Sequence, residues 1–166
     1  MSNTEYEITP TNLVIKPLQL RSILGFRRLF HEAVDNHFTY FPSNQRRKVL
    51  RMHNHLKILL AIIMPRRIIL TAYIDGELSG YAVGSIPKDQ SGQLYWLYVD
   101  PIQRGSNTGL ALLSRMIRLE ADKGAKEVVL VTHDHRKYYQ RQGFKYVKTV
   151  QEAGVDLALM VFRIKG

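Results

Sequence analysis

Hydrophobic and polar positions in the first third of the chain repeat with the period of a helix. Apolar residues recur at helical spacing from residue 18 to about residue 37, and a second such pattern runs from residue 43 to about residue 64. Pro42 separates the two patterns, because proline disfavours helical geometry in the residue before it. Ser43 is therefore the expected N-cap of the second helix. Residues 12–16 form a short expected strand ahead of both helices.

The middle of the chain predicts three consecutive antiparallel strands. Residues 66–74 and 78–86 flank Asp75-Gly76, a dipeptide that favours a tight hairpin turn. A polar turn follows, and residues 93–99 form the third expected strand.

The remainder of the chain alternates helices and strands. An amphipathic helix follows the loop at residues 100–109, and Gly124 stands where a left-handed C-terminal cap is expected. The elements after it are a strand at 127–132, a helix at 135–142, and strands at 144–150 and 157–164. This order predicts one α/β domain with a mixed sheet, spanning residues 1–166.

Composition narrows the class of protein. The 166 residues are 45% hydrophobic and 23% charged, as in ordinary globular proteins. The chain has no cysteine, which excludes disulfides, thiolate metal ligands and a cysteine nucleophile. Its N-terminus does not resemble a secretory signal, and the apolar run from Leu56 to Met64 is too short to span a bilayer. We expect a cytoplasmic protein without a membrane partner.

The net charge of +10 has three interpretations: a nucleic acid, an anionic membrane surface, or an anionic ligand. The charges are spread along the chain, and the densest groups lie at residues 46–51, 66–67 and 136–141. Charge distributed in this way mostly reflects solubility and weak adhesion to polyanions. No specific nucleic-acid binding is therefore expected.

Residues 97–113, LYVDPIQRGSNTGLALL, carry the clearest chemical signal. An apolar strand ends at Asp100-Pro101, and a loop containing Arg104 and Gly105 leads into a helix near Gly109. Unpaired N–H groups and the positive end of the helix dipole make such a junction receptive to phosphate. The spacing fits neither a Walker A loop nor the G-x-G-x-x-G dinucleotide motif. The sequence thus indicates a phosphorylated cofactor of another kind.

Two segments carry a family resemblance. Val99-x-Pro101 followed by Arg104-x-x-Asn107-x-Gly109 and Leu112-Leu113 resembles motif A of the GNAT superfamily of acyl-CoA-dependent N-acyltransferases. The segment from Tyr138 to Phe144 is similar to the family's second hallmark, an aromatic-Tyr-x-[RK]-x-G-F pattern. The element order is similar over nearly the whole chain. The resemblance implies a mostly antiparallel central sheet flanked by helices, with acetyl-CoA as cofactor and no metal.

The resemblance also implies roles for individual residues. Strand residues would pair with the pantetheine arm, and loop amides would hold the pyrophosphate. Tyr139 falls on the family's tyrosine that lies near the thiol and protonates the leaving thiolate; packing of Tyr138 and Tyr139 in the core is the alternative. The residues implied for the cofactor are Leu97, Tyr98, Val99, Arg104, Gly105, Ser106, Asn107, Thr108 and Gly109.

The chain departs from the family pattern at two places. Asn107 stands where the family has the first glycine of the loop, and asparagine is the best substitute in a left-handed turn because its short polar side chain tolerates that conformation. It could also cap the helix. The strand before the loop lacks the carboxylate that serves many members as a base. A water chain, or a helix residue such as Glu32 or His37, is the remaining source of a base.

The resulting functional hypothesis is an N-acetyltransferase. It would move an acetyl group from acetyl-CoA to a primary amine, of a small molecule or of a peptide or protein, by direct attack in a ternary complex. Residues 36–41, NHFTYF, are the expected wall of the amine site. His133, Asp134 and His135 are interpreted as a polar loop. The protein is expected to be a monomer or a homodimer, and a non-catalytic module of the same fold that senses CoA or binds RNA is the alternative.

Overall fold

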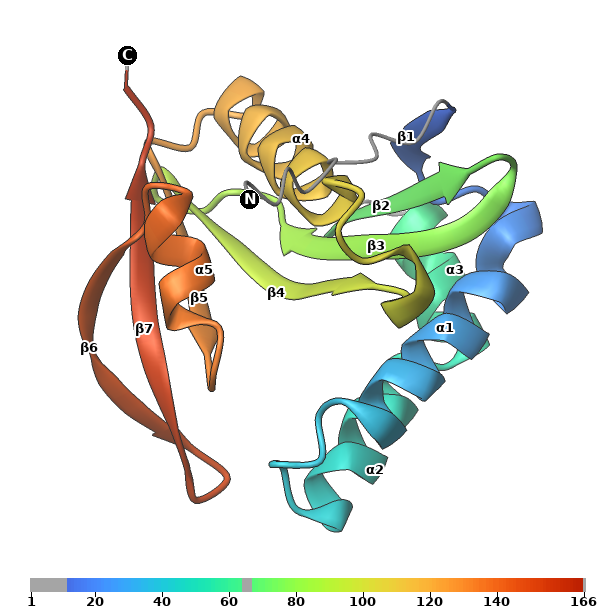
Figure 1. Ribbon diagram of the computed structural model, residues 1–166, viewed down its shortest axis with the longest axis horizontal. Helices are drawn as coiled ribbons and strands as arrows, with labels where there is room; N and C mark the ends of the chain where they lie inside the picture. Colours follow the sequence, from blue (N-terminus) through green and yellow to red (C-terminus); the bar gives the residue numbers. More distant parts are fainter. Residues whose placement is uncertain (1–11, 64–66, 166) are drawn as a thin grey trace, which may run out of the picture.

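The computed structural model describes residues 12–63 and 67–165, and within them the strands form one seven-stranded sheet (Figure 1). The strand order is β1-β2-β3-β4-β5-β7-β6, and every neighbouring pair is antiparallel except β4 and β5. The predicted α/β fold with a mostly antiparallel sheet is confirmed. The strands are β1 Leu13–Pro17, β2 Arg67–Ile74, β3 Glu77–Ser85, β4 Ser91–Val99, β5 Glu127–Thr132, β6 Lys145–Glu152 and β7 Val155–Arg163.

Helices cover both faces of the sheet. The helix α4 (Thr108–Asp122) buries Leu112, Leu113 and Met116 in one core cluster against β2, β3 and β5. On the other face, α1 (Ile23–Asn36) buries Phe26 and Phe30 in a second core cluster. The remaining helices are η1 Leu20–Ser22, α2 Ser43–Met52, α3 His55–Ile63, η2 Pro101–Gln103 and α5 Arg136–Arg141.

The expected single helix over residues 43–64 is wrong, because the chain breaks at His53 and Asn54 between α2 and α3. The ring of His53 stacks on Phe30 at 4.3 Å, and its Nδ1 lies 2.9 Å from the Val49 carbonyl oxygen. Asn54 then starts the next helix by accepting a hydrogen bond from the Lys57 amide at 3.0 Å. The helical pattern is thus interrupted because buried His53 ends α2 and the side chain of Asn54 caps the start of α3. Residue 64 lies outside the described residues.

Two expected helix starts also differ. Ser43 is the first residue of α2 rather than its N-cap, which is Pro42 without a side-chain hydrogen bond. The helical pattern from residue 18 begins with the short η1 before α1. Gly124 adopts the expected left-handed conformation, with φ of +92°. Among the described residues, no helix is long and apolar enough to cross a membrane.

The feature that positions the site is the divergence of β4 from β5. Their parallel pairing covers only Ser91 to Leu94 on β4, and the strand continues to Val99 without a partner on β5. A bulge lies at the same point, since Val83 pairs with Trp96 and Gly84 with Leu94, which leaves Tyr95 as the extra residue. Bulges bend and twist the strand that carries them. The sheet therefore opens into a V between β4 and β5 (Figure 1).

Candidate active site

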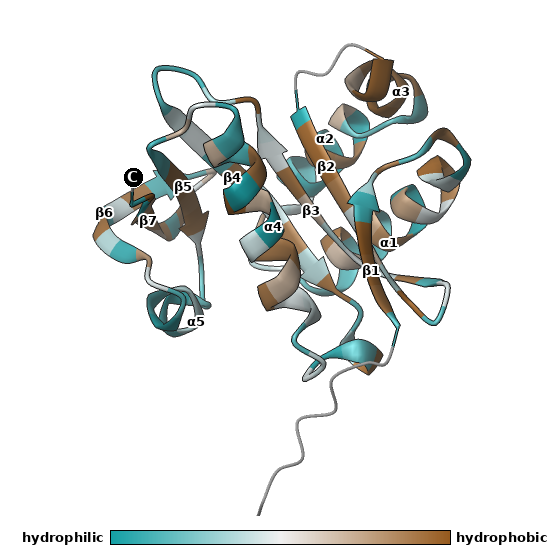
Figure 2. Ribbon diagram, turned by 90° about the horizontal axis from the view of Figure 1, so that it is seen from above, coloured by the Kyte–Doolittle hydropathy of each residue, from teal (hydrophilic) through white to brown (hydrophobic). Residues whose placement is uncertain are grey.

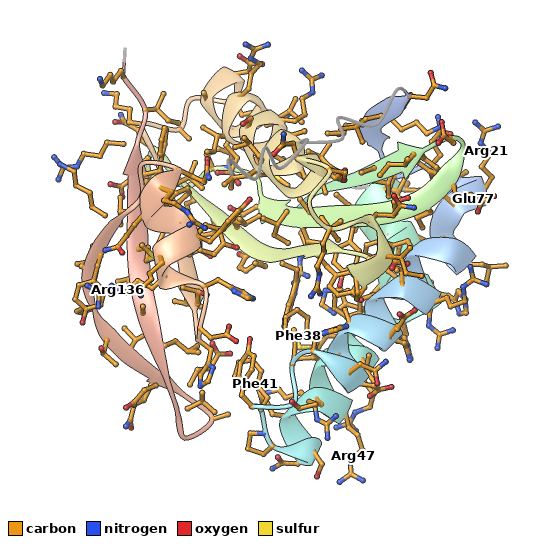
Figure 3. The ribbon with its side chains drawn as sticks, in the orientation of Figure 1. Arg21, Phe38, Phe41, Arg47, Glu77 and Arg136 are labelled. Atoms are coloured by element: carbon orange, nitrogen blue, oxygen red, sulfur yellow. The ribbon has the colours of Figure 1, made fainter. Side chains whose placement is uncertain are left out.

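A cavity of about 850 Å³ occupies the opening between β4 and β5. Its walls come from β4, the β4–α4 loop, the N-terminus of α4, helix α5, and the connection between α1 and α2. In Figure 3, Phe38 and Phe41 lie on the side of that connection that faces α5. The cavity therefore joins segments from both halves of the sheet.

The β4–α4 loop is held in a fixed shape by its own hydrogen bonds. Asp100 donates its amide to Ser79 O at 2.9 Å, and its carboxylate accepts from the Ile102 amide at 2.9 Å. Gly105 and Asn107 both take positive φ, +85° and +57°. The left-handed conformation expected for Asn107 is confirmed. Its expected helix-capping side chain is not, because that side chain makes no cap hydrogen bond.

A chain of hydroxyls ties the loop to the helix. The Ser106 hydroxyl donates to Gln103 O at 2.5 Å, so the Thr108 hydroxyl, at 2.8 Å, must donate to Ser106 Oγ. These bonds explain why Ser106 alone among the predicted cofactor-binding residues does not line the cavity. Its side chain stabilises the loop through these hydrogen bonds instead of facing the cavity.

Consecutive backbone amides at this junction have no protein acceptor. Within the described residues, the N–H groups of residues 105–110 donate no hydrogen bond to protein, while Ala111 is the first to bond inside the helix, to Asn107 O at 3.0 Å. All of these residues except Ser106 line the cavity. Unpaired donors at a helix N-terminus favour an anion there. The junction thus fits a pyrophosphate.

Arg104 adds positive charge to this end of the cavity. Its Nε donates to Val99 O at 3.3 Å, and its guanidinium lies 5.9 Å from the centre of the Tyr98 ring. Arg141 of α5 also lines the cavity. Burial raises the pKa of Tyr138, and the positive charge of Arg141 partly offsets that increase. The phosphate-receptive end is therefore cationic.

The two adjacent tyrosines of α5 lie in different surroundings. Tyr139 is only 9% exposed and packs in the α4-side core cluster, yet it also lines the cavity. Burial raises the pKa of Tyr139 well above the ordinary value. A Cβ on Gly109 would lie 3.4 Å from the Tyr138 hydroxyl, which places Tyr138 beside the loop. The hydroxyl of Tyr139 is therefore protonated at neutral pH.

The opposite end of the cavity is aromatic and acidic. Tyr40 stacks on His133 with ring centres 4.4 Å apart and planes 6° apart. Burial raises the pKa of Tyr40 to about 12, with the carboxylates of Asp134 and Glu152 adding to the shift. Asp134 Oδ1 also lies 3.5 Å from His135 Nε2. This end suits a cationic or polar group better than a phosphate.

Of the two candidate bases, one lines the cavity and the other does not. His37 lines the cavity, and its ring centre lies 5.4 Å from that of Tyr98. Glu32 is exposed and does not line the cavity, although its charge contributes to the raised pKa of Tyr98. Of the two side chains, only His37 faces the space in which an amine would lie.

The structure brings most of the sequence-predicted residues to one cavity. Leu97, Tyr98 and Val99, the loop residues other than Ser106, and Tyr139 all line it, as do His37, Phe38, Tyr40 and Phe41 of the expected wall. The sequence did not indicate Glu152, which arrives from the tip of the β6–β7 hairpin. No motif marks that residue, because only the curvature of the two strands brings it to the cavity.

Comparison with known proteins supports a specific family. The model of the acetyltransferase (GNAT) family matches residues 27–144. An uncharacterized N-acetyltransferase of Mycobacterium bovis is 35% identical over 85 residues, 49% of this chain and 54% of that protein. A protein of the same description from Mycobacterium tuberculosis matches equally. The match thus spans about half the length of these curated relatives.

Solved structures share the fold at low sequence identity. The PaiA N-acetyltransferase of Thermoplasma acidophilum, in complex with coenzyme A, has a TM-score of 0.77 at 19% identity and covers 93% of this chain and 100% of its own. A Salmonella typhimurium protein solved with its cofactor acetyl-CoA has a TM-score of 0.68 at 19% identity, covering 94% and 96%.

Proposed function

Because this chain belongs to the acetyltransferase (GNAT) family, we propose that it transfers an acetyl group from acetyl-CoA to a primary amine. The observation that supports this most is the row of unpartnered amides at residues 105–110, which borders the cavity at the point where β4 leaves β5. The solved neighbours with coenzyme A or acetyl-CoA agree with the same cofactor. The amides would hold the pyrophosphate, and the free edge of β4 at Leu97, Tyr98 and Val99 would hold the pantetheine arm.

Acetyl-CoA supplies the thioester, and the protein supplies position and two proton transfers. As the amine nitrogen bonds to the acetyl carbon, the carbon–sulfur bond breaks and the sulfur needs a proton. Tyr139 is the proposed donor, because burial keeps its hydroxyl protonated at neutral pH. The proton lost from the amine would leave through water or His37, the candidate base that lines the cavity.

The amine is proposed to enter at the end opposite the loop. Tyr40, Asp134 and Glu152 line that end, where two carboxylates offset the basic character of the chain. This local charge favours an amine that arrives as a cation, since opposite charge at the mouth of a cleft raises the local concentration of a ligand. The acceptor class therefore covers small amines and peptide amines alike.

The test is a thiol-release assay with acetyl-CoA and a panel of primary amines and peptide N-termini, run beside calorimetric titration with CoA. The proposal expects CoA binding and turnover with at least one amine. Binding without turnover on any amine would favour a CoA-sensing module. Absence of CoA binding would overturn the proposal altogether, and a salt-sensitive association with RNA in its place would favour a polyanion-binding module.

A further inference from the structure

A second surface of the molecule, away from the cavity mouth, combines exposed apolar and basic side chains on α3. Leu56, Leu60 and Ile63 are 63%, 44% and 63% exposed. They stand four and three residues apart, so they form one stripe along the helix. Ile58 is the residue of α3 that is buried. Figure 2 shows α3 at the periphery with a mostly hydrophobic ribbon.

The charged residues of the chain segment that contains this stripe have a single sign. Residues 36–74 contain seven Lys or Arg and no Asp or Glu. Arg51 in the last turn of α2 and Lys57 on α3 are exposed beside the stripe in sequence. Arg27 of α1 reaches α3 as well, with its guanidinium 3.1 Å from His55 Nδ1. We define the basic apolar face as Arg51, Leu56, Lys57, Leu60 and Ile63.

The charge decides between possible occupants of this face. A second copy of the chain would meet it with an identical surface, and a symmetric contact would place cations against cations. A nucleic acid would match the charge but would leave the apolar stripe exposed to water. A bilayer containing anionic lipid satisfies both properties, because its headgroups attract Lys and Arg while its acyl boundary accepts apolar side chains.

We propose that the basic apolar face docks this protein on an anionic lipid surface. Helix α3 has nine residues, which is far too few to span a bilayer, so it would lie in the plane of the interface. This proposal departs from the expectation, drawn from the sequence, of no membrane partner. None of the five residues of this face lines the cavity, so a docked protein would keep the cavity free of the lipid surface.

The test is co-sedimentation of the full chain with vesicles of phosphatidylcholine alone or with 30% phosphatidylglycerol, at two salt concentrations. We expect at least fivefold more bound protein on the anionic vesicles at low salt, and loss of that difference at high salt. The variant Leu56→Ser/Ile63→Ser should abolish binding. Val147→Ser, which removes an apolar side chain that is 53% exposed on β6, should leave binding unchanged.

Charge variants separate the electrostatic contribution. Arg51→Gln/Lys57→Gln should weaken vesicle binding about tenfold, because each basic residue near the surface contributes to the attraction. Lys123→Gln/Lys126→Gln, which removes the same charge from the exposed connection between α4 and β5, should bind within twofold of the wild type. Equal loss in both double variants would overturn the proposal, since it would show only a response to net charge.

Three other results would also overturn it. Binding to phosphatidylcholine vesicles that ignores anionic lipid would contradict the charge argument. A lipid-free dimer that Leu56→Ser/Ile63→Ser dissociates would assign the stripe to a second copy. Binding to an acidic polypeptide such as polyglutamate, but not to anionic vesicles, would assign the face to a protein partner. The vesicle assay needs no acetyl transfer, so its result is independent of the proposed function.

Discussion

At the scale of single residues, Asn107 shows how a glycine position can be filled without changing the backbone. Its φ of +57° lies in the left-handed region, which asparagine tolerates better than other residues that carry a Cβ. Its side chain makes no cap hydrogen bond, so the side chain does not cap α4.

Substitutions at Asn107 should therefore follow backbone preference. Asn107→Gly should change the free energy of unfolding by less than about 0.5 kcal/mol, whereas Asn107→Val should lower it by about 1–2 kcal/mol. Urea denaturation of both variants measures this. Equal stability of the two variants would contradict a left-handed residue 107.

Replacing Tyr139 should affect the turnover rate more than the affinity for CoA. Tyr139→Phe should lower kcat at least tenfold and leave CoA affinity within threefold, because general acid catalysis commonly contributes a factor of a hundred or more. Tyr138→Phe is the matched control, since that neighbour lies beside the loop, and its kcat should stay within threefold. A larger fall in kcat for Tyr138→Phe would move the proton donor to that residue.

Gly109 tests the phosphate cradle directly. A Cβ there would lie 3.4 Å from Tyr138 Oη and 3.6 Å from Val99 Cγ2, which are ordinary contacts, so a side chain fits without unfolding the loop. Gly109→Glu should nevertheless abolish CoA binding by placing a negative charge beside the unpaired amides. Ser114→Glu, exposed on the same helix, should bind CoA normally in calorimetric titration. Unchanged binding by Gly109→Glu would place the pyrophosphate elsewhere.

At the scale of elements, α4 carries an ionisable carboxyl group in the protein core. Glu120 is fully buried, and neither carboxylate oxygen has a partner among the described residues. The carboxyl group packs so closely against Gly92 that a Cβ on that residue would overlap Glu120 Oε2. Burial raises its pKa from 4.5 to about 7. The folded protein thus holds this proton more tightly than the unfolded chain does.

This difference predicts how stability depends on pH. The contribution of Glu120 is largest below pH 4.5 and is lost as the pH rises to about 7, because only the unfolded chain releases the proton in that range. The loss is on the order of 3 kcal/mol. Glu120→Gln should therefore be more stable than the wild type at pH 8 and similar at pH 4, as measured by thermal unfolding. An equal difference at both pH values would contradict the buried, protonated carboxyl.

Periodicity and turn residues predicted most elements, and long-range contacts account for the failures. The strand at residues 127–132 matches β5, and Asp75-Gly76 forms the β2–β3 turn as expected. The break between α2 and α3 could not be read from the sequence, because it depends on His53 packing against Phe30 in another helix. The bulge at Tyr95 and the arrival of Glu152 likewise depend on how strands pair and curve.

At the scale of the whole molecule, the sheet consists of two parts joined by a short parallel pairing. Only Ser91 to Leu94 connect β4 to β5, so a ligand seated in the opening would touch both parts. A molecule bound to the folded protein alone stabilises it, by about 2.7 kcal/mol at a hundred times its dissociation constant. A ligand bound in this opening would therefore also strengthen the connection between the two parts of the sheet.

CoA should accordingly raise the melting temperature and slow hydrogen exchange on both sides of the opening, in β4 and in α5. Differential scanning fluorimetry and hydrogen-exchange mass spectrometry measure the two effects. Gly109→Glu should show neither. Protection confined to the β4–α4 loop would show that the ligand does not link the two parts.

The two ends of the cavity differ in how the chain builds them. The phosphate-receptive end is one continuous stretch from β4 through the loop into α4, and a core cluster anchors it. The amine end is assembled from three separate places: the α1–α2 connection, the β5–α5 turn at Asp134, and the hairpin tip at Glu152. Under the roles proposed for the two ends, sequence changes at those tips would alter the acceptor site one loop at a time and leave the β4–α4 loop unchanged. Such an arrangement would let the acceptor change more readily than the cofactor.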